Sequence, residues 1–352
     1  MSQDSSVIFK NVVKAFNDTQ VVKSINFQVN SGKLVTLLGP SGCGKTTTLR
    51  MIAGLELPTS GEIYISGKEV SKVSASGRNV GMVFQSYALF PHMTVFQNVC
   101  YGLSNHKSKK LEMLDKAEKA LATVGLSHLK ERYPSELSGG QQQRVAIARS
   151  IVIQPDVLLF DEPLSNLDAK LRRQVRQDIR DLQQEIGVTA IYVTHDQEEA
   201  LAISDDIIVM DDGNISQIGS PDNLYKHPKN DFVAQFIGDA NKLTGHLIGN
   251  EENCIFKIHE HSLFSYKGKK PIGKYDVFIR PNALKFIEPD NSNDVFFPAK
   301  IKKSIYLGSH TEYQLESAWG ESLFMIDYSF DAPLSNLSEV FVAIDARGVS
   351  IV

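Results

Sequence analysis

The segment Gly39-Pro40-Ser41-Gly42-Cys43-Gly44-Lys45-Thr46-Thr47 decides the fold, because it fits the phosphate-loop pattern G-x-x-x-x-G-K-[ST]. The apolar run 34–38 before it is typical of a buried strand, and residues 47–53 after it have helical periodicity. A strand, a glycine-rich turn and a helix in this order are the context that the motif requires. The segment therefore predicts a nucleotide-binding loop, in preference to a glycine-rich turn that binds nothing.

The residue types in this loop suit a nucleoside triphosphate. Glycines let backbone N–H groups approach phosphate oxygens, and the helix N-terminus adds roughly half a positive charge. Lys45 is predicted to reach the β- and γ-phosphates, and the Thr46 hydroxyl to hold Mg²⁺. Cys43 lies near the same helix N-terminus and Lys45, so its thiol is predicted to be reactive.

Composition narrows the class of protein. The chain has 352 residues, enough for two or three domains. Its net charge of −4 argues against a protein that binds nucleic acid over a large basic surface. No apolar run approaches the roughly 20 residues that span a bilayer, so we expect neither insertion nor secretion. Three cysteines without metal spacing suit a reducing cytosol, and the basic residues 106–110 are predicted to form a solvated loop.

Carboxylates and a histidine follow two further apolar strands. Strand 157–160 ends in Asp161 and Glu162, which places Asp161 to complete the Mg²⁺ site and Glu162 to act on a water molecule. Strand 189–193 delivers His195 to the same edge of the sheet, where a role in the site is favoured over a structural one. The helix between these strands is predicted to turn a stripe from Leu171 to Ile186 inward.

Other segments have simpler patterns. Paired strands are predicted over 7–30 with Phe16 before the turn, where position alone does not exclude an ordinary core aromatic. Residues 86–95 are unusually apolar for a segment containing proline, so they are either buried or a docking surface. Residues 100–135 are predicted to be a helical insertion. From about residue 240 short β-type runs recur, which predicts a separate small β-barrel.

One further motif begins a predicted helix. Leu137-Ser138-Gly139-Gly140-Gln141 puts a capping serine and two glycines at the helix start, a pattern that alone is equally met in a plain capped turn. Together with the motifs above, it makes residues 7–237 resemble the ATP-binding subunits of ABC transporters. Residues 240–352 resemble the oligobinding-type domains attached to importers of sugars, ferric iron, polyamines and phosphonates.

The resemblance implies a fold class and domain limits. It implies an α/β P-loop NTPase core, with a RecA-like sheet, an antiparallel β subdomain and a helical insertion, followed by an all-β oligobinding-type barrel. The expected limits are 1–239 for the ATPase domain, with a helical subdomain at about 88–150, and 240–352 for the barrel.

It also implies site residues and partners. Phe16 would stack on adenine, Gln85 would sense Mg²⁺, His195 would hold the γ-phosphate, and Asp168 would belong to the D-loop of the nucleotide site. Two copies would pair head to tail, so that Ser138–Gln141 of one closes over the ATP of the other. Two membrane-spanning permease subunits would dock at about residues 86–96, on the cytoplasmic face of the inner membrane, and an extracytoplasmic solute-binding protein would act indirectly.

The cargo is a separate question. Gly238–Asn241, Ile279–Pro281 and Trp319 look most like the ferric-iron importer ATPases, although Asn282 departs from the usual acidic residue. Ferric iron is therefore the expected cargo, and a phosphonate, a sugar phosphate, a polyamine or a sugar is the alternative. A soluble ABC ATPase usually carries two ATPase units or coiled-coil insertions, and a P-loop kinase or GTPase would lack Leu137–Gln141, so neither class is favoured.

Overall fold

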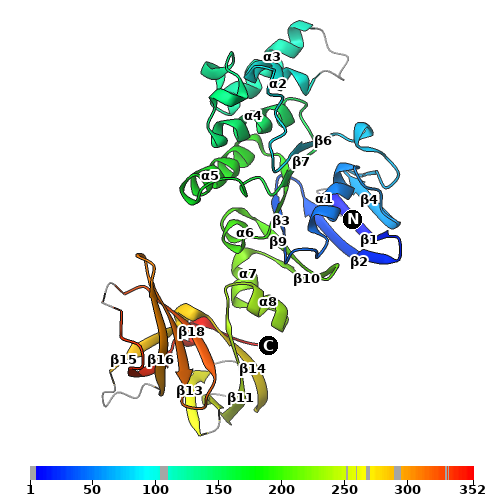
Figure 1. Cartoon of the computed structure of the whole chain (residues 1–352). Coiled ribbons are helices and arrows are strands. Elements are labelled where there is room, and N and C mark those ends of the chain that lie inside the picture. The colour runs from blue at the N-terminus through cyan, green and yellow to red at the C-terminus, as the bar shows by residue number, and fades with distance from the viewer. Residues whose placement is uncertain are drawn as a thin grey trace. The chain divides into compact units, whose positions relative to one another are not determined.

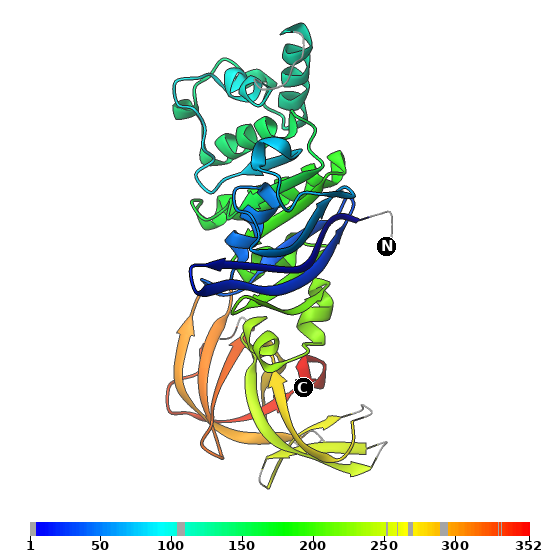
Figure 2. The same ribbon diagram turned by 90° about the vertical axis from the view of Figure 1, so that its right-hand side faces the viewer.

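A computed structural model shows two compact units, Met1–Pro221 and Asp222–Val352 (Figure 1 and Figure 2). The structure describes residues 5–103, 110–250, 253–258, 260–266, 270–288, 295–329, 331 and 333–352. The predicted basic loop 106–110 lies, except for Lys110, outside these residues. Within them, no helix is long and apolar enough to cross a membrane.

A six-stranded sheet is the centre of the first unit, with strand order β10-β9-β3-β8-β7-β6. All neighbours pair in parallel except β10, which forms an antiparallel hairpin with β9. The carboxyl ends of the parallel strands therefore meet at one edge, where α/β proteins bind ligands. The strands of this sheet are β3 Leu34–Leu38, β6 Val80–Val83, β7 Val157–Asp161, β8 Thr189–Thr194, β9 Asp206–Asp211 and β10 Asn214–Gly219.

One face of this sheet packs against an antiparallel sheet and a helix. The helix α1, Lys45–Ala53, contributes Leu49 and Ile52 to a core shared with Val35 of β3 and Phe9 of the second sheet. The second sheet has the order β2-β1-β4-β5. Its strands are β1 Ser5–Phe16, β2 Thr19–Asn30, β4 Ser60–Ile65 and β5 Lys68–Glu69.

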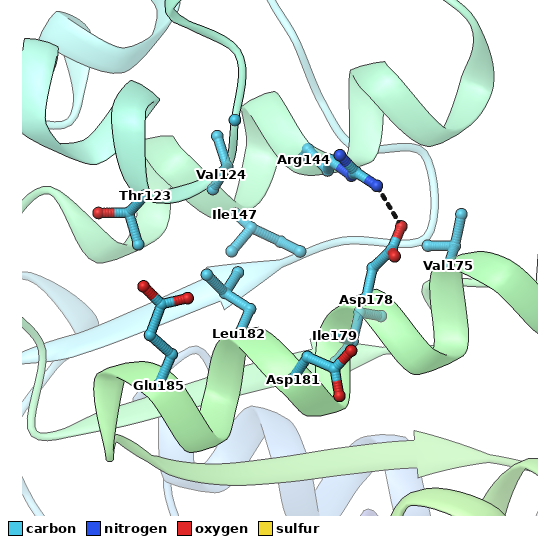
Figure 3. Close-up of a pocket in the computed structure, with 11 residues that line it drawn as sticks. Thr123, Val124, Arg144, Ile147, Val175, Asp178, Ile179, Asp181, Leu182 and Glu185 are labelled. Atoms are coloured by element: carbon cyan, nitrogen blue, oxygen red, sulfur yellow. Dashed lines mark hydrogen bonds and ion pairs between the residues drawn. The ribbon is translucent and has the colours of Figure 1, made fainter.

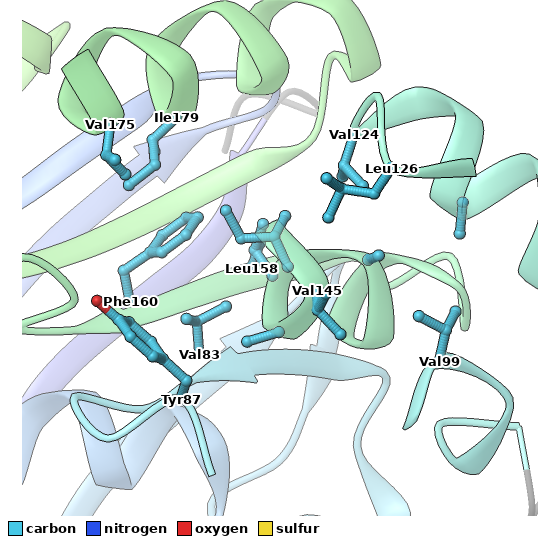
Figure 4. Packing of buried hydrophobic residues seen from close by; sticks show 14 of the residues in the cluster. Val83, Tyr87, Val99, Val124, Leu126, Val145, Leu158, Phe160, Val175 and Ile179 are labelled. Atoms are coloured by element: carbon cyan, nitrogen blue, oxygen red, sulfur yellow. The ribbon is translucent and has the colours of Figure 1, made fainter. Parts of the chain in front are cut away.

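Helices cover the opposite face of the sheet. Successive strand residues point to opposite sides, so each strand also supplies apolar side chains to this second face. Figure 4 shows Leu158 and Phe160 of β7 packed with Val145 and Val175 from two of these helices. The α-helices in this layer and the helical insertion are α2 Val95–Tyr101, α3 Lys110–Thr123, α4 Gly139–Ile151, α5 Ala169–Ile186 and α6 Gln197–Ile203. Short 3₁₀ turns occur at η1 Ala75–Gly77, η2 Ser127–Leu129 and η3 Pro134–Glu136.

The predicted inward stripe of α5 is wrong at its end. Ile186 is 39% exposed, whereas Gln183 is buried. The Gln183 amide donates to the carbonyl oxygens of Gly32 (2.9 Å) and Val188 (2.7 Å), so it satisfies loop carbonyls that an isoleucine could not. At the end of α5, hydrogen bonding to the adjoining loops decides which side chain is buried. The spacing of apolar residues in the sequence does not show such bonds.

The second unit confirms the predicted all-β domain. Two five-stranded antiparallel sheets, β13-β12-β11-β14-β20 and β15-β19-β16-β17-β18, enclose a shared apolar core that includes Phe256, Phe297 and Leu315. The strands of the first are β11 Asn241–Asn250, β12 Asn253–Ile258, β13 His261–Tyr266, β14 Gly273–Ile279 and β20 Val349–Ile351. Those of the second are β15 Leu284–Ile287, β16 Phe296–Tyr306, β17 Thr311–Ser317, β18 Ser322–Asp327 and β19 Glu339–Ile344.

The short helices α7 Pro221–Lys226 and α8 Asp231–Phe236 adjoin this domain, which also has 3₁₀ turns at η4 Pro281–Ala283 and η5 Ala346–Gly348. Arg280, only 2% exposed, donates to the carbonyl oxygens of Tyr225, Ala234 (2.9 Å) and Ile237. This guanidinium holds both helices to the β-domain, which explains why the compact units divide after Pro221. The domain limit at residue 239 stays a prediction.

Candidate nucleotide site

The phosphate loop connects β3 to α1 and leaves the start of the helix open. Gly42 and Gly44 have φ angles of 83° and 102°, in the left-handed region that favours glycine. A Cβ on Gly39 would lie 2.2 Å from the carbonyl oxygen of Met210, so the loop passes too close to β9 for a side chain. Gly44 is the N-cap of α1 and provides no side-chain cap, which leaves the helix amides to an anion.

Lys45 is buried in the middle of this loop, at 5% exposure. Its Nζ donates to the carbonyl oxygens of Gly39 (2.7 Å) and Pro40 (2.8 Å). A buried ammonium must have acceptors, and the loop carbonyls supply them. Because the ammonium lies beside uncapped helix amides, the loop fits a polyphosphate.

Cys43 differs from the prediction. Its side chain is buried, with Sγ 3.7 Å from Lys45 Nζ. Burial raises the pKa of the Cys43 thiol, and this effect outweighs the attraction of Lys45 for a thiolate. The predicted reactive thiolate is therefore wrong, because the sequence shows the neighbouring charge but not the burial.

The predicted acidic pair and histidine do meet at the carboxyl edge of the sheet. Asp161 pairs with Val193 on the neighbouring strand, so the residues that follow are side by side. His195 Nδ1 lies 3.3 Å from Glu162 Oε2. Burial raises the pKa of Asp161, Arg50 acts against that rise, and the charge of Glu162 adds to it. A nearby cation would stabilise the ionised Asp161 carboxylate.

Gln85 is joined by hydrogen bonds to the segment that follows Glu162. The Gln85 Nε2 donates to Ser165 Oγ (2.9 Å), and the Asn166 amide donates to the Gln85 carbonyl oxygen (3.1 Å). Asp168 accepts from the Leu171 N–H (2.9 Å) and is the N-cap of α5. The segment 165–168 is thereby tied both to Gln85 and to a helix.

The Ser138–Gln141 motif begins α4 as predicted. Ser138 accepts from the Gln141 N–H (3.4 Å), and the Gln141 side chain accepts from the Ser138 N–H (2.9 Å), which is a capping box. A Cβ on Gly140 would lie 3.1 Å from Val175 of α5. Among the described residues, no hydrogen bond joins this motif to the phosphate loop within one chain.

Phe16 ends β1 at the tip of a hairpin and is 43% exposed. Lys14 Nζ lies 4.6 Å from the ring centroid. An aromatic ring with one face near a cation and much of its surface open can stack on a base. The core alternative for Phe16 does not fit this exposure.

The segment 86–96 contains two buried residues, Tyr87 and Val95, and several half-buried ones. Tyr87 is 6% exposed and belongs to the core, so its predicted part in a docking surface is wrong. Leu89, Phe90 and Met93 are only partly buried. The sequence did not indicate what shapes this segment: buried Asn98 contacts Phe90, Met93 and Thr94 through their backbone atoms.

A second residue that sequence reasoning missed is Arg149 of α4. Its guanidinium donates to the carbonyl oxygens of Tyr87 (2.8 Å) and Ala88 (2.7 Å), which both have positive φ angles. The guanidinium carbon is also 5.7 Å from the Phe90 ring centroid. The sequence signal for the role of Arg149 is a long charged side chain within the otherwise mostly apolar run 145–153.

A cavity of about 260 Å³ lies away from these groups, between the end of α3, α4 and α5 (Figure 3). Arg144 of α4 forms an ion pair with Asp178 of α5 at this cavity. None of the predicted site residues lines it. The nucleotide site is therefore not this cavity.

The donor set fits Mg²⁺. Among the described residues there is no cluster of three or more His, Cys, Asp or Glu side chains that could hold a metal alone. Mg²⁺ usually takes one or two protein oxygens, with the remainder from substrate phosphates and water. Thr46 in the first turn of α1 supplies a hydroxyl of this kind, and Asp161 at the carboxyl end of β7 supplies a carboxylate.

Comparisons with known proteins agree with this geometry. The chain matches the ABC transporter family over residues 22–165 and the TOBE domain family over residues 277–352. It belongs to the ATP-binding proteins of ABC transporters, with an ATPase core and a C-terminal TOBE domain. It is 49% identical over 350 residues to a Fe(3+) ions import ATP-binding protein of Rhizobium meliloti, covering 99% of this chain and 98% of the relative. The counterpart in Vibrio cholerae is 44% identical, with the same coverage.

Solved structures cover the ATPase part. CbiO1 of Clostridium perfringens, part of an ABC transporter complex, has a TM-score of 0.59 at 31% identity, over 64% of this chain and 92% of that chain. An ATP-binding cassette in a dimeric post-hydrolysis state with ADP and phosphate has a TM-score of 0.52 at 32% identity, over 61% and 98%.

Proposed function

We propose that the chain is the ATP-hydrolysing subunit of an importer whose cargo is ferric iron. The observation that carries the ATPase role is the convergence of the buried Lys45 loop, Asp161 and the Glu162–His195 pair at one edge of the sheet. Support for the cargo comes from the full-length relatives that are named for Fe(3+) import. Phosphonate, sugar phosphate, polyamine and sugar remain the alternatives.

Each site residue has a proposed part in hydrolysis. Lys45 and the backbone N–H groups of the phosphate loop bind the phosphates, while Thr46, Asp161 and Gln85 would hold Mg²⁺. When bound, Mg²⁺ neutralises charge on the phosphate oxygens. Glu162 orients the attacking water and accepts its proton, and His195 holds the γ-phosphate.

Two copies complete the site in this proposal. Ser138–Gln141 starts the helix α4, yet it has no described hydrogen bond to the phosphate loop of its own chain. A head-to-tail pair would place this helix start and Asp168 over the ATP of the partner copy. Closure on ATP and release on hydrolysis then form a two-state device.

The proposal also covers the partners of the subunit. Segment 86–96, fixed by Asn98 and Arg149, would receive the permease subunits through its half-buried residues Leu89, Phe90 and Met93. The subunit would then lie peripherally on the cytoplasmic face of the inner membrane. A solute-binding protein would act only through the permease.

The test removes the proposed base and keeps its shape. Glu162→Gln should bind ATP and form an ATP-dependent dimer on size exclusion, with turnover reduced by about 10²–10⁴-fold. Lys45→Ala should lose both binding and dimer. Turnover at the parent rate by Glu162→Gln would remove the base assignment, and an inactive monomer with ATP would refute the head-to-tail closure.

The cargo needs a separate assay in whole cells. Glu162→Gln should abolish uptake of labelled ferric iron and leave uptake of labelled phosphonate, sugar phosphate, polyamine and sugar unchanged. Loss of one of those instead would reassign the cargo without touching the ATPase assignment.

A further inference from the structure

Five described residues have a buried side-chain nitrogen or oxygen without a hydrogen-bond partner: Thr48, Tyr87, Gln143, Arg172 and Arg280. The first four lie shortly after Thr46, Gln85, Gln141 and Asp168, all of which are proposed site residues. Buried polar atoms are rarely left unpaired, so each needs a reason. Of these residues, Arg172 has two carboxylates just beyond hydrogen-bonding distance.

Arg172 connects the end of the D-loop to the segment around His195. Its Nη2 donates to the Leu167 carbonyl oxygen (3.1 Å), one residue before Asp168. Its Nη1 is 3.8 Å from Asp196 Oδ2, and its buried Nε is 3.9 Å from Glu199 Oε1. A charge-assisted N–H···O bond is about 2.7–2.9 Å long, so the Nε pair is about 1 Å too far apart.

Glu199 fixes the residues on both sides of His195. It is 5% exposed, and its Oε2 accepts from Thr194 Oγ1 (2.8 Å) and from the Tyr192 hydroxyl (3.2 Å). Thr194 Oγ1 in turn accepts from the Asp196 N–H (3.0 Å). Asp196 then caps α6 by accepting from the Glu199 N–H (3.1 Å). Movement of Glu199 would therefore move the backbone that carries His195.

We propose that Arg172 and Glu199 are positioning residues that couple the D-loop to His195. In the hydrolysing state the D-loop carries Arg172 about 1 Å closer, and Nε donates to Oε1. Arg172 Nε and Glu199 Oε1 form a hydrogen bond only in the hydrolysing state, and this bond stabilises that state. This inference rests on the proposed roles of His195 and Asp168.

The test uses the purified full chain and separates kcat from KM. Glu199→Gln keeps an oxygen for Thr194 and Tyr192 but turns an amide N–H₂ toward Arg172. Losing one charge-assisted hydrogen bond in the transition state should lower kcat about tenfold to hundredfold, with KM for MgATP and the melting temperature nearly unchanged. Arg172→Met should have the same effect, and Arg172→Lys should restore part of the rate. The matched control is Arg173→Met, one residue along α5 and solvent-exposed.

A double-mutant cycle decides whether the two residues act together. Arg172→Met with Glu199→Gln should be no slower than either single variant. Rate losses that multiply, or a parent rate in Glu199→Gln, would overturn the coupling. If His195→Ala turns over ATP normally, the proposed site fails; if only His195→Ala is inactive, the coupling alone fails.

Discussion

The exposed ring of Phe16 offers the clearest separation of nucleotide binding from folding. The side chain is 43% exposed, and Lys14 Nζ lies over one face, which leaves the opposite face for a purine. Base–aromatic stacking contributes about 1–3 kcal/mol. Phe16→Ala should therefore weaken ATP binding about 5-fold to 150-fold.

The cost to stability should be small. Truncating a fully buried phenylalanine costs about 3–5 kcal/mol. Phe27 is such a residue, 6% exposed with its ring centroid 4.4 Å from that of Phe9. Because Phe16 leaves nearly half its surface in water, Phe16→Ala should cost less than about 1.5 kcal/mol.

Calorimetric titration with ATP and urea unfolding of the same samples would measure the two effects. Phe27→Ala should lose stability, and Phe341→Ala, with a ring 37% exposed in the TOBE domain, should leave ATP affinity unchanged. Phe16→Leu keeps apolar volume without a π-face and should bind almost as weakly as Phe16→Ala. An affinity within threefold of the parent for Phe16→Ala would refute the stacking.

Two other predictions concern Cys43 and the domain limit. Since burial raises the thiol pKa, alkylation of Cys43 followed by mass spectrometry should be slower near pH 8 than that of a free cysteine, and faster as pH rises; a rate equal to free cysteine would contradict this. A fragment of residues 1–221 should fold and bind ATP. A fragment of residues 1–239 keeps α7 and α8 but lacks Arg280, so it should melt at a lower temperature than the 1–221 fragment. Equal melting temperatures would show that these helices need no β-domain.

Much of the site could be predicted because its chemistry depends on local context. The phosphate loop is recognisable from glycine spacing between a strand and a helix, and both acidic residues follow a fully apolar strand. The parallel order of strands then brings Glu162 and His195 together although they are far apart in the sequence. Carboxyl-edge reasoning captures such a pair without any knowledge of side-chain geometry.

Other features depend on contacts that no pattern encodes. Tyr87 lies in an apolar segment that suggests a docking surface, but its side chain belongs to the core. Arg149 of α4 donates hydrogen bonds to the carbonyl oxygens of Tyr87 and Ala88, which fixes this part of the segment against α4. Asn98 belongs to no motif, yet it is buried and its amide donates to three carbonyl groups of the segment before it. Buried polar residues of this kind are assigned only when their partners are known.

The backbone at Glu162 explains how a residue at a strand end comes to face His195, as its proposed role requires. Glu162 has φ = 44°, a left-handed conformation that costs a non-glycine residue about 1 kcal/mol or more. Its N–H donates to the Val193 carbonyl oxygen (3.1 Å), and the Ser165 N–H and Oγ donate to its own carbonyl oxygen (3.4 and 3.1 Å). These bonds hold the turn, so the carboxylate leaves the strand direction and reaches His195 at 3.3 Å. The strained backbone therefore orients the Glu162 side chain toward His195, whereas a regular strand would direct it elsewhere.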